Sequence, residues 1–194
     1  MDKQLKEKIQ QLAKEAKVKF GKPLTLEEIQ ETETKLRLKI PQEYRDFLEI
    51  FGCMQGVGLE VLGRAPDRFT VRRPTGEIRG SALGRTLDLR EAYPTFPKNC
   101  IAIEFDGGEG WYCIVCGGED HGKVIYWDMW CDPEQAYPNI PKPEWFEKHP
   151  NWAKGHITGK KEDFWVEAFN FWDFLIKRLE ETKRKVEEER RSAK

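Results

Sequence analysis

The chain has 194 residues, of which 39% are hydrophobic and 35% charged, and its formal net charge is −1. This length allows one domain with a buried core, and the small net charge excludes a global electrostatic attraction to nucleic acid or to a membrane surface. No apolar run reaches the length of a membrane span, and the N-terminal residues lack the apolar segment of a signal peptide. We therefore expect a cytoplasmic protein that binds neither nucleic acid nor membranes.

Residues 1–22 are predicted to form an N-terminal helical extension. Within residues 1–20, apolar residues recur at helical spacing among six lysines: Leu5, Ile9, Leu12 and Ala16. This spacing predicts an amphipathic helix, which Gly21 and Pro23 bring to an end. Because its apolar content is modest, we expect this helix to dock only weakly on the domain that follows.

Two helices are predicted next, before any strand. Thr25 and Glu28 have the spacing of a capping box, in which each side chain bonds the other residue's backbone N–H. Pro41 suits the first turn of the second helix, and Gly52 ends that helix with a left-handed backbone. One apolar stripe runs along the second helix: Tyr44, Phe47, Leu48 and Phe51.

The segment that follows is predicted to mix short strands, a turn and a short helix. Residues 59–62 and 69–71 have the composition of strands, and residues 74–76 that of a turn. A short helix should start at Thr86 and end before Pro94. Charge is uneven here: residues 60–98 hold eight Arg or Lys against five Asp or Glu, and residues 99–139 hold eight Asp or Glu against one Lys.

Residues 99–130 are predicted to form a three-stranded meander on which the rest of the chain packs. Aromatic and β-branched residues gather in three runs: 100–105, 111–116 and 123–127. The glycine-rich stretches 106–110 and 117–122 separate these runs, and glycine reaches the positive φ angles of tight turns without steric cost. Two short loops between three such runs favour antiparallel pairing.

The last third of the chain is predicted to hold a surface excursion and a long helix. Residues 133–161 contain five prolines and little periodicity. A buried helix capped by Asp163 should follow, with two apolar stripes: Phe164, Ala168, Phe171 and Leu175 in one, and Trp165, Phe169, Trp172 and Ile176 in the other. Residues 181–194 should continue it as a solvated, charged helical tail, so that the domain itself spans residues 23–180.

Periodicity also predicts which side chains form the core. The helical stripes and the inward faces of the strands select ten positions. They are Tyr44, Phe47, Leu48, Phe51, Ile101, Ile103, Ile114, Ile125, Phe171 and Leu175.

Several of these motifs together resemble the SMI1/KNR4 family, which belongs to the SUKH superfamily. The most specific motif is Leu-x-Leu-x-Ile-Pro-x-Glu-Tyr-Arg-x-Phe-Leu at residues 36–48, and it is followed by the Gly-Gly-x-Gly turn at 107–110 and the Phe-x-x-Phe-Leu helix at 171–175. The resemblance covers about residues 25–180. It implies an α+β fold, with a mostly antiparallel sheet flanked by helices, to which extra N- and C-terminal helices would be added here. It also implies a non-catalytic role, as an immunity protein in bacteria or as a scaffold of cell-wall signalling in fungi.

Cys113 and Cys116 form a CxxC pair, and with His121 and Cys131 they supply four potential zinc ligands. Residues i and i+3 of a strand point to opposite faces, so the two thiols should diverge. The sequence contains no second CxxC pair. We therefore expect no metal or other cofactor, and five free cysteines that pack as small hydrophobic residues in a reducing compartment.

No catalytic set is recognisable in the sequence. The three histidines fall in polar, loop-like segments, and no Gly-x-Ser-x-Gly nucleophile elbow is present. The 106–110 loop is acidic and lacks the Lys-Ser/Thr pair of a phosphate-binding loop. We therefore expect that the protein is not an enzyme.

Acidic and aromatic residues are interleaved along the meander. The candidate partner-binding residues are Asp106, Glu109, Trp111, Glu119, Asp120, Trp127, Asp128, Trp130 and Asp132. Negative charge steers a basic partner toward the surface and aromatic side chains supply binding energy, which is what an inhibitor of a basic, nucleic-acid-degrading enzyme needs. The alternative is that the tryptophans belong to the core and the acids are ordinary loop charges.

Three functions fit these observations. The first is a protein-binding domain of the immunity type, which neutralises a bacterial toxin by binding it. The second is an intracellular regulatory scaffold of the SMI1/KNR4 type. The third, less favoured because the ligand geometry is poor, is a small metal-dependent hydrolase built on the cysteine, histidine and carboxylate loops.

Overall fold

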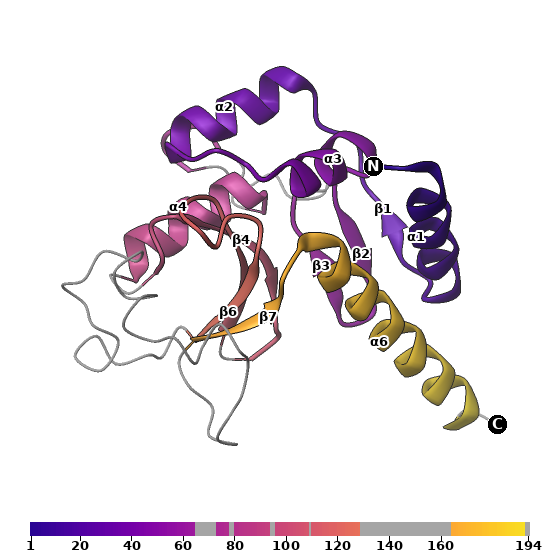
Figure 1. The fold of residues 1–194 in the computed structure, drawn as a ribbon. Helices are drawn as coiled ribbons and strands as arrows, with labels where there is room; N and C mark the ends of the chain where they lie inside the picture. The colour runs from indigo at the N-terminus through magenta and orange to yellow at the C-terminus, as the bar shows by residue number, and fades with distance from the viewer. Residues whose placement is uncertain (65–72, 78–79, 94–95, 109, 129–163, 193–194) are drawn as a thin grey trace.

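The computed structural model describes residues 1–64, 73–77, 80–93, 96–108, 110–128 and 164–192. Within these residues the chain forms two antiparallel sheets with helices packed around them (Figure 1). The predicted α+β class is therefore confirmed. The excursion at 133–161 and the strand expected at 69–71 lie outside the described residues.

The larger sheet has the order β4-β5-β6-β7, and its first three strands are the predicted meander. They are β4 (Cys100–Phe105), β5 (Gly110–Val115) and β6 (Val124–Asp128), joined by the two glycine-containing turns. Neighbouring strands in this sheet are antiparallel. In their register, Cys113 on β5 lies between Ala102 on β4 and Ile125 on β6. The alternation of aromatic and β-branched residues thus identified both the strands and their order.

The fourth strand, β7 (Phe164–Ala168), corrects the prediction of a helix that starts after Asp163. The segment pairs antiparallel with β6, with Val124 opposite Ala168. Asn170 begins the following helix, because its side-chain oxygen accepts a hydrogen bond from the Asp173 backbone N–H at 2.8 Å. The apolar residues at 164–168, which periodicity assigned to the stripes of a helix, therefore belong to a strand, whose aromatic and β-branched side chains favour that structure.

The smaller sheet has the order β1-β2-β3 and was only partly predicted. Its strands are β1 (Lys19–Phe20), β2 (Met54–Gly56) and β3 (Leu59–Val61). Only β3 was expected, since two- and three-residue strands leave too short a pattern to recognise. The Leu62 backbone N–H donates to the Ile103 carbonyl at 2.6 Å and so connects this sheet to β4.

Helices α2 (Leu26–Leu36) and α3 (Gln42–Ile50) form as their end signals predicted. Both hydrogen bonds of the Thr25–Glu28 capping box are present. Gly52 follows α3 with φ of +70°, and a Cβ there would meet the Lys22 carbonyl oxygen, so glycine is required. The apolar stripe of α3 points into the core.

Helices α1 (Lys3–Glu15) and α6 (Phe171–Ser192) lie side by side along one flank of the molecule (Figure 1). Ile9 and Ala13 on α1 are fully buried, and Val186 near the end of α6 is also buried. The N-terminal helix therefore buries more apolar surface than its weak docking was expected to give, and the tail predicted as solvated buries Thr182 and Val186. Each helix has an apolar stripe that is short on its own, and the two stripes cover each other.

Helix α4 (Ala82–Ala92) packs on one face of the larger sheet, against β4. It begins at a Ser81 cap, earlier than the predicted start at Thr86, and ends before Pro94 as expected. Thr86 is buried, and its hydroxyl oxygen accepts a hydrogen bond from the Ala102 backbone N–H at 3.1 Å. None of the helices within the described residues is both long and apolar enough to span a membrane.

All ten predicted core residues are buried in the structure. Aromatic rings from α3 and α6 meet at its centre: the Phe171 ring centroid lies 5.1 Å from those of Tyr44 and of Phe47. The Tyr44 hydroxyl donates to the Leu62 carbonyl at 2.7 Å, which satisfies the polar end of a buried ring. The N-terminal part of α6 is thus part of the same core as α3.

The Phe47→Ala substitution should lower the free energy of unfolding by about 3–5 kcal/mol, because a fully buried ring is lost and a cavity remains. Chemical denaturation followed by circular dichroism measures this loss. Phe169→Ala is the matched control, since 66% of that residue is exposed and its removal should cost about 0.5 kcal/mol or less. Equal losses in the two variants would contradict the assignment of Phe47 to the core.

Candidate functional site

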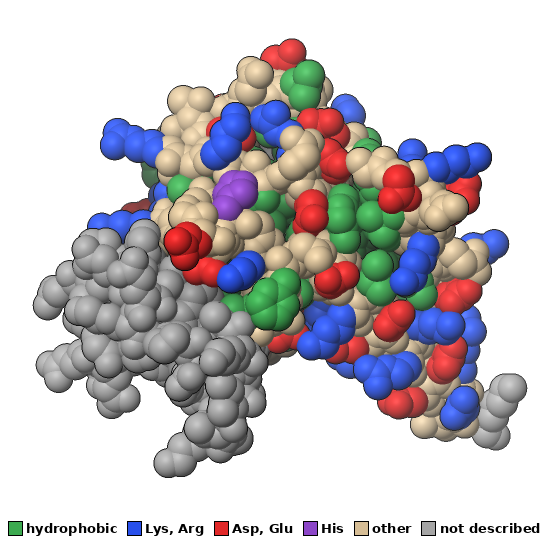
Figure 2. Space-filling view, viewed as in Figure 1, with side chains coloured by type: hydrophobic (Ala, Val, Ile, Leu, Met, Phe, Trp, Pro, Cys, Tyr) green, Lys and Arg blue, Asp and Glu red, His purple; other side chains and the backbone are tan. Residues whose placement is uncertain are grey.

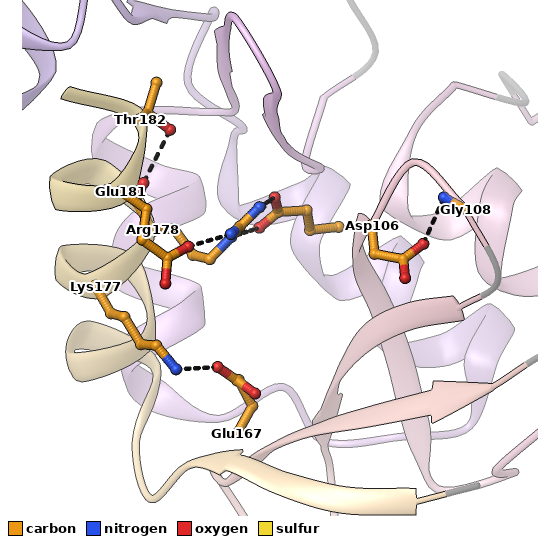
Figure 3. Close-up of polar contacts among 8 residues, drawn as sticks. Asp106, Gly108, Glu167, Lys177, Arg178, Glu181 and Thr182 are labelled. Carbon is orange, nitrogen blue, oxygen red and sulfur yellow. Dashed lines mark hydrogen bonds and ion pairs between the residues drawn. The ribbon is translucent and has the colours of Figure 1, made fainter. Parts of the chain in front are cut away.

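Asp106, the first predicted site residue, organises the turn between β4 and β5. One of its carboxylate oxygens accepts hydrogen bonds from the backbone N–H groups of Gly108 and Gly110, at 2.8 and 3.1 Å; the Gly108 bond is drawn in Figure 3. The other oxygen accepts from the Tyr126 hydroxyl at 2.6 Å. Its side chain therefore fixes the shape of the turn.

The turn between β5 and β6 carries Glu119 and Asp120. Glu119 is exposed, and the Asp120 carboxylate forms an ion pair with Lys123 in the same turn. His121 is exposed beside them. The backbone is also tied back on the sheet, since the Gly122 N–H donates to the Val115 carbonyl at 2.9 Å. This turn presents its charge on a fixed backbone.

The predicted acidic surface is divided between the two ends of the sheet. Asp106 follows β4 and Asp128 lies opposite Gly110, so both are at one end. Glu119 and Asp120 lie beyond the far end of β5, which is six residues long and therefore spans roughly 17 Å. Glu109, Trp130 and Asp132 lie outside the described residues. The described acidic residues therefore cannot all contribute to one flat contact surface.

The predicted tryptophans are core residues in the described part of the meander, which corrects their assignment to the surface. Trp127 is fully buried, and the ring centroids of Tyr93 and Phe96 lie 5.5 and 5.0 Å from its own. Trp111 is opposite Trp127 on the same face, is buried, and packs against Phe105. The structure shows that the two rings share a face and that α4 and the residues after it cover that face.

The CxxC pair is buried and reduced. Cys113 and Cys116 are free thiols in the structure, and burial raises the pKa of each thiol well above its ordinary value. Neutral thiols are poor metal ligands, because zinc binds the thiolate. Among the residues that the structure describes, no three His, Cys, Asp or Glu side chains are grouped to hold a metal ion. Cys131 lies outside these residues, so the absence of zinc stays a prediction.

A buried ion pair that the sequence did not reveal joins the larger sheet to α6. The Glu104 side chain on β4 is fully buried, and Arg178 Nε lies 3.1 Å from each of its carboxylate oxygens, with Nη2 at 2.5 Å from one of them. Burial raises the pKa of Glu104 to about 7, and the Arg178 guanidinium acts against this rise. Arg178 also pairs with Glu181, one turn further along α6 (Figure 3). The pair fixes α6 on the sheet at one rotation.

Arg178→Met should destabilise the protein by about 3–5 kcal/mol, because it leaves the Glu104 carboxylate buried without a partner. Urea denaturation at neutral pH measures the change. The double variant Glu104→Leu with Arg178→Met should recover part of the loss, since no buried charge then remains.

Lys177→Met is the control for this experiment. Lys177 is the preceding residue of α6, and its ion pair with Glu167 is half exposed (Figure 3). An exposed pair contributes about 1 kcal/mol or less. A loss for Arg178→Met as small as that for Lys177→Met would contradict the structural role of the buried pair.

A pocket of about 470 Å³ lies between α2, α3 and the start of α4. Its floor is formed by core side chains, among them Tyr44, Leu48 and Ile101. Charged side chains form its rim, and each is paired within the rim: Arg64 with Glu28, and Lys35 with Glu31 and Glu77. No sequence pattern predicted this pocket, because its walls come from segments far apart in the chain.

Glu77 is the most buried of these rim carboxylates. Lys35 donates to its carboxylate at 2.8 Å and the Thr75 hydroxyl also donates to it, and these contacts lower the pKa of Glu77 from 4.5 to about 2. The folded state therefore binds the proton more weakly than the unfolded state. The resulting stabilisation is complete above pH 4.5 and is lost as the pH falls toward 2.

Glu77→Gln should therefore reduce the free energy of unfolding by about 1–2 kcal/mol at pH 7 and by progressively less below pH 4.5. Urea denaturation of both proteins at several pH values between 3 and 7 provides the comparison. Glu31→Gln removes the other carboxylate on Lys35, which is more than half exposed, and should cost less at every pH. A Glu77→Gln difference that is constant over this pH range would refute the pKa assignment.

A family model described as SMI1-KNR4 cell-wall, one of the SUKH families, matches residues 3–147. A comparison with curated proteins found no match. The matched segment includes α1, both turns of the meander and the pocket, and it covers more than half of the chain. The chain therefore belongs to the SMI1-KNR4 family of the SUKH superfamily.

Proposed function

We propose that this protein is an immunity-type binding protein, which neutralises a bacterial toxin domain by binding it and carries out no reaction itself. Family membership supports the proposal, because SUKH domains generally interact with proteins and are generally non-catalytic. The toxin is expected to be basic around its active site, as enzymes that degrade nucleic acid are, since their substrate is a polyanion. The immunity protein would then cover that site.

The observation that carries the proposal is the pair of acidic turns held rigidly at the ends of the larger sheet. Asp106 bonds two backbone N–H groups and the Tyr126 hydroxyl, and the β5–β6 turn is tied to Val115. Rigid loops lose little conformational entropy when a partner binds. Carboxylates on such loops accelerate the encounter with a basic partner and select against acidic ones. A preorganised acidic surface suits a tight protein inhibitor.

The two ends of the sheet can be tested separately, because the structure places them apart. One variant carries Glu119→Lys and Asp120→Lys, and the other carries Glu109→Lys and Asp128→Lys. The probe is the protein encoded by the reading frame next to the gene of this protein, tested as the candidate toxin and titrated at low and at moderate salt. The variant at the end that the toxin contacts should associate about three- to tenfold more slowly at low salt, with a weaker dependence on salt.

A matched control carries Glu188→Lys and Glu189→Lys on the exposed face of α6, with the same change in net charge. It should retain the wild-type association rate if the charge acts locally. Circular dichroism should show both turn variants folded, with a stability cost of about 0.5 kcal/mol for each reversal. Absence of toxin binding by the wild-type protein, or equal association by all folded variants, would refute the proposal.

A further inference from the structure

Phe169 is the most exposed large hydrophobic residue in the described part of the chain. Its exposed fraction is 66%, although it lies between a paired strand and a helix. Ala168 is paired with Val124 on β6, and Asn170 is fixed by its hydrogen bonds with Asp173. The backbone on both sides is therefore rigid, and the ring projects from it. An aromatic ring held in water by a rigid backbone loses little entropy when it is buried by a partner.

The β5–β6 turn lies against the Phe169 ring. Lys123 Nζ lies 5.7 Å from the ring centroid, which is within the range of a cation–π contact. The same ammonium group pairs with Asp120. The turn and the ring are thus joined into one surface, although they are more than 40 residues apart in the sequence. Hydrophobic and acidic side chains also lie next to one another on the face shown in Figure 2.

The charge around this ring is negative. Four carboxylates lie at the junction of β7 with α6 or in the turn beside it: Glu43, Asp120, Glu167 and Asp173. Glu43 is placed there by the Phe171 backbone N–H, which donates to it at 2.9 Å. The basic side chains joined to the same group are Lys123 and Lys177. Four negative and two positive charges give these six side chains a net charge of −2, whereas the whole chain carries only −1.

We infer that the junction of β7 with α6, together with the β5–β6 turn, is the docking surface for the toxin, with Phe169 as its central anchor. This inference rests on the proposed function and places toxin binding at the end of the larger sheet that carries the β5–β6 turn. The partner that fits is a basic protein surface with an apolar recess that accepts the ring. Aromatic anchors at the centre of an interface carry much of the binding energy, and the charges around them govern encounter and exclude water.

The opposite end of the sheet fits less well. Its exposed aromatic residue, Phe105, is only 38% exposed, because its ring packs on Trp111. Asp106 at that end already accepts three hydrogen bonds. A partner there would meet a ring and a carboxylate that are largely engaged within the fold.

The experiment measures the Kd and the dissociation rate of the toxin domain with the full chain and with its Phe169→Ala variant. Removal of the anchor should weaken binding at least about tenfold, mainly through faster dissociation. Phe169→Trp should retain most of the affinity, because a larger aromatic ring remains. Leu26→Ala is the control, since Leu26 is 54% exposed on the first turn of α2 and its removal should leave the Kd unchanged.

Thermal unfolding should show Phe169→Ala folded, so that weaker binding reports a lost contact. Wild-type affinity in this folded variant would overturn the docking surface, while toxin binding as such would still support the proposed function. An equal loss in Leu26→Ala would also overturn it, because the effect would not be specific to this junction. Failure of the wild-type protein to bind the toxin would refute both proposals.

Discussion

The buried ion pair between Glu104 and Arg178 is the interaction on which the arrangement of the molecule depends. It places a guanidinium from α6 over β4 and β5, where the carboxylate is shielded from water. Because a buried carboxylate is strongly destabilising without its partner, only one rotation of α6 satisfies it. That rotation directs Phe171 into the ring cluster of α3 and allows Lys183 to pair with Glu15 on α1. One polar contact thereby sets the position of the whole C-terminal helix.

The pairing of β7 with β6 has a comparable effect on the surface. It returns the chain to the sheet directly before α6, so that the junction lies beside the β5–β6 turn. Glu43, at the start of α3, also lies at this junction, because its carboxylate accepts a hydrogen bond from the Phe171 backbone N–H. Three segments that are distant in sequence thus bring their carboxylates to one end of the sheet. Composition alone had shown an acidic stretch, but the topology concentrates the charge.

Local patterns predicted what depends on local structure. The Thr25 capping box, the Gly52 helix end and the three strands of the meander each have a signal within a few residues, and each was confirmed. The partner of Arg178 could not be predicted, since it lies 74 residues away and the charges around it looked like those of a solvated helix. The burial of Trp127 was also not predictable, because alternation does not tell which face of a sheet is covered.

The position of one helix boundary explains why periodicity placed Phe169 in the core. A helix that began after Asp163 would carry Phe169 in a buried stripe with Trp172 and Ile176. Because β7 occupies residues 164–168 and Asn170 caps α6, Phe169 instead falls outside the helix and projects into water. The hypothesis of an acidic surface with an aromatic anchor rests on the same physical argument, but we propose Phe169 as the anchor instead of the tryptophans. Trp111 and Trp127 stabilise the core, and the exposed ring comes from a residue that periodicity had placed inside.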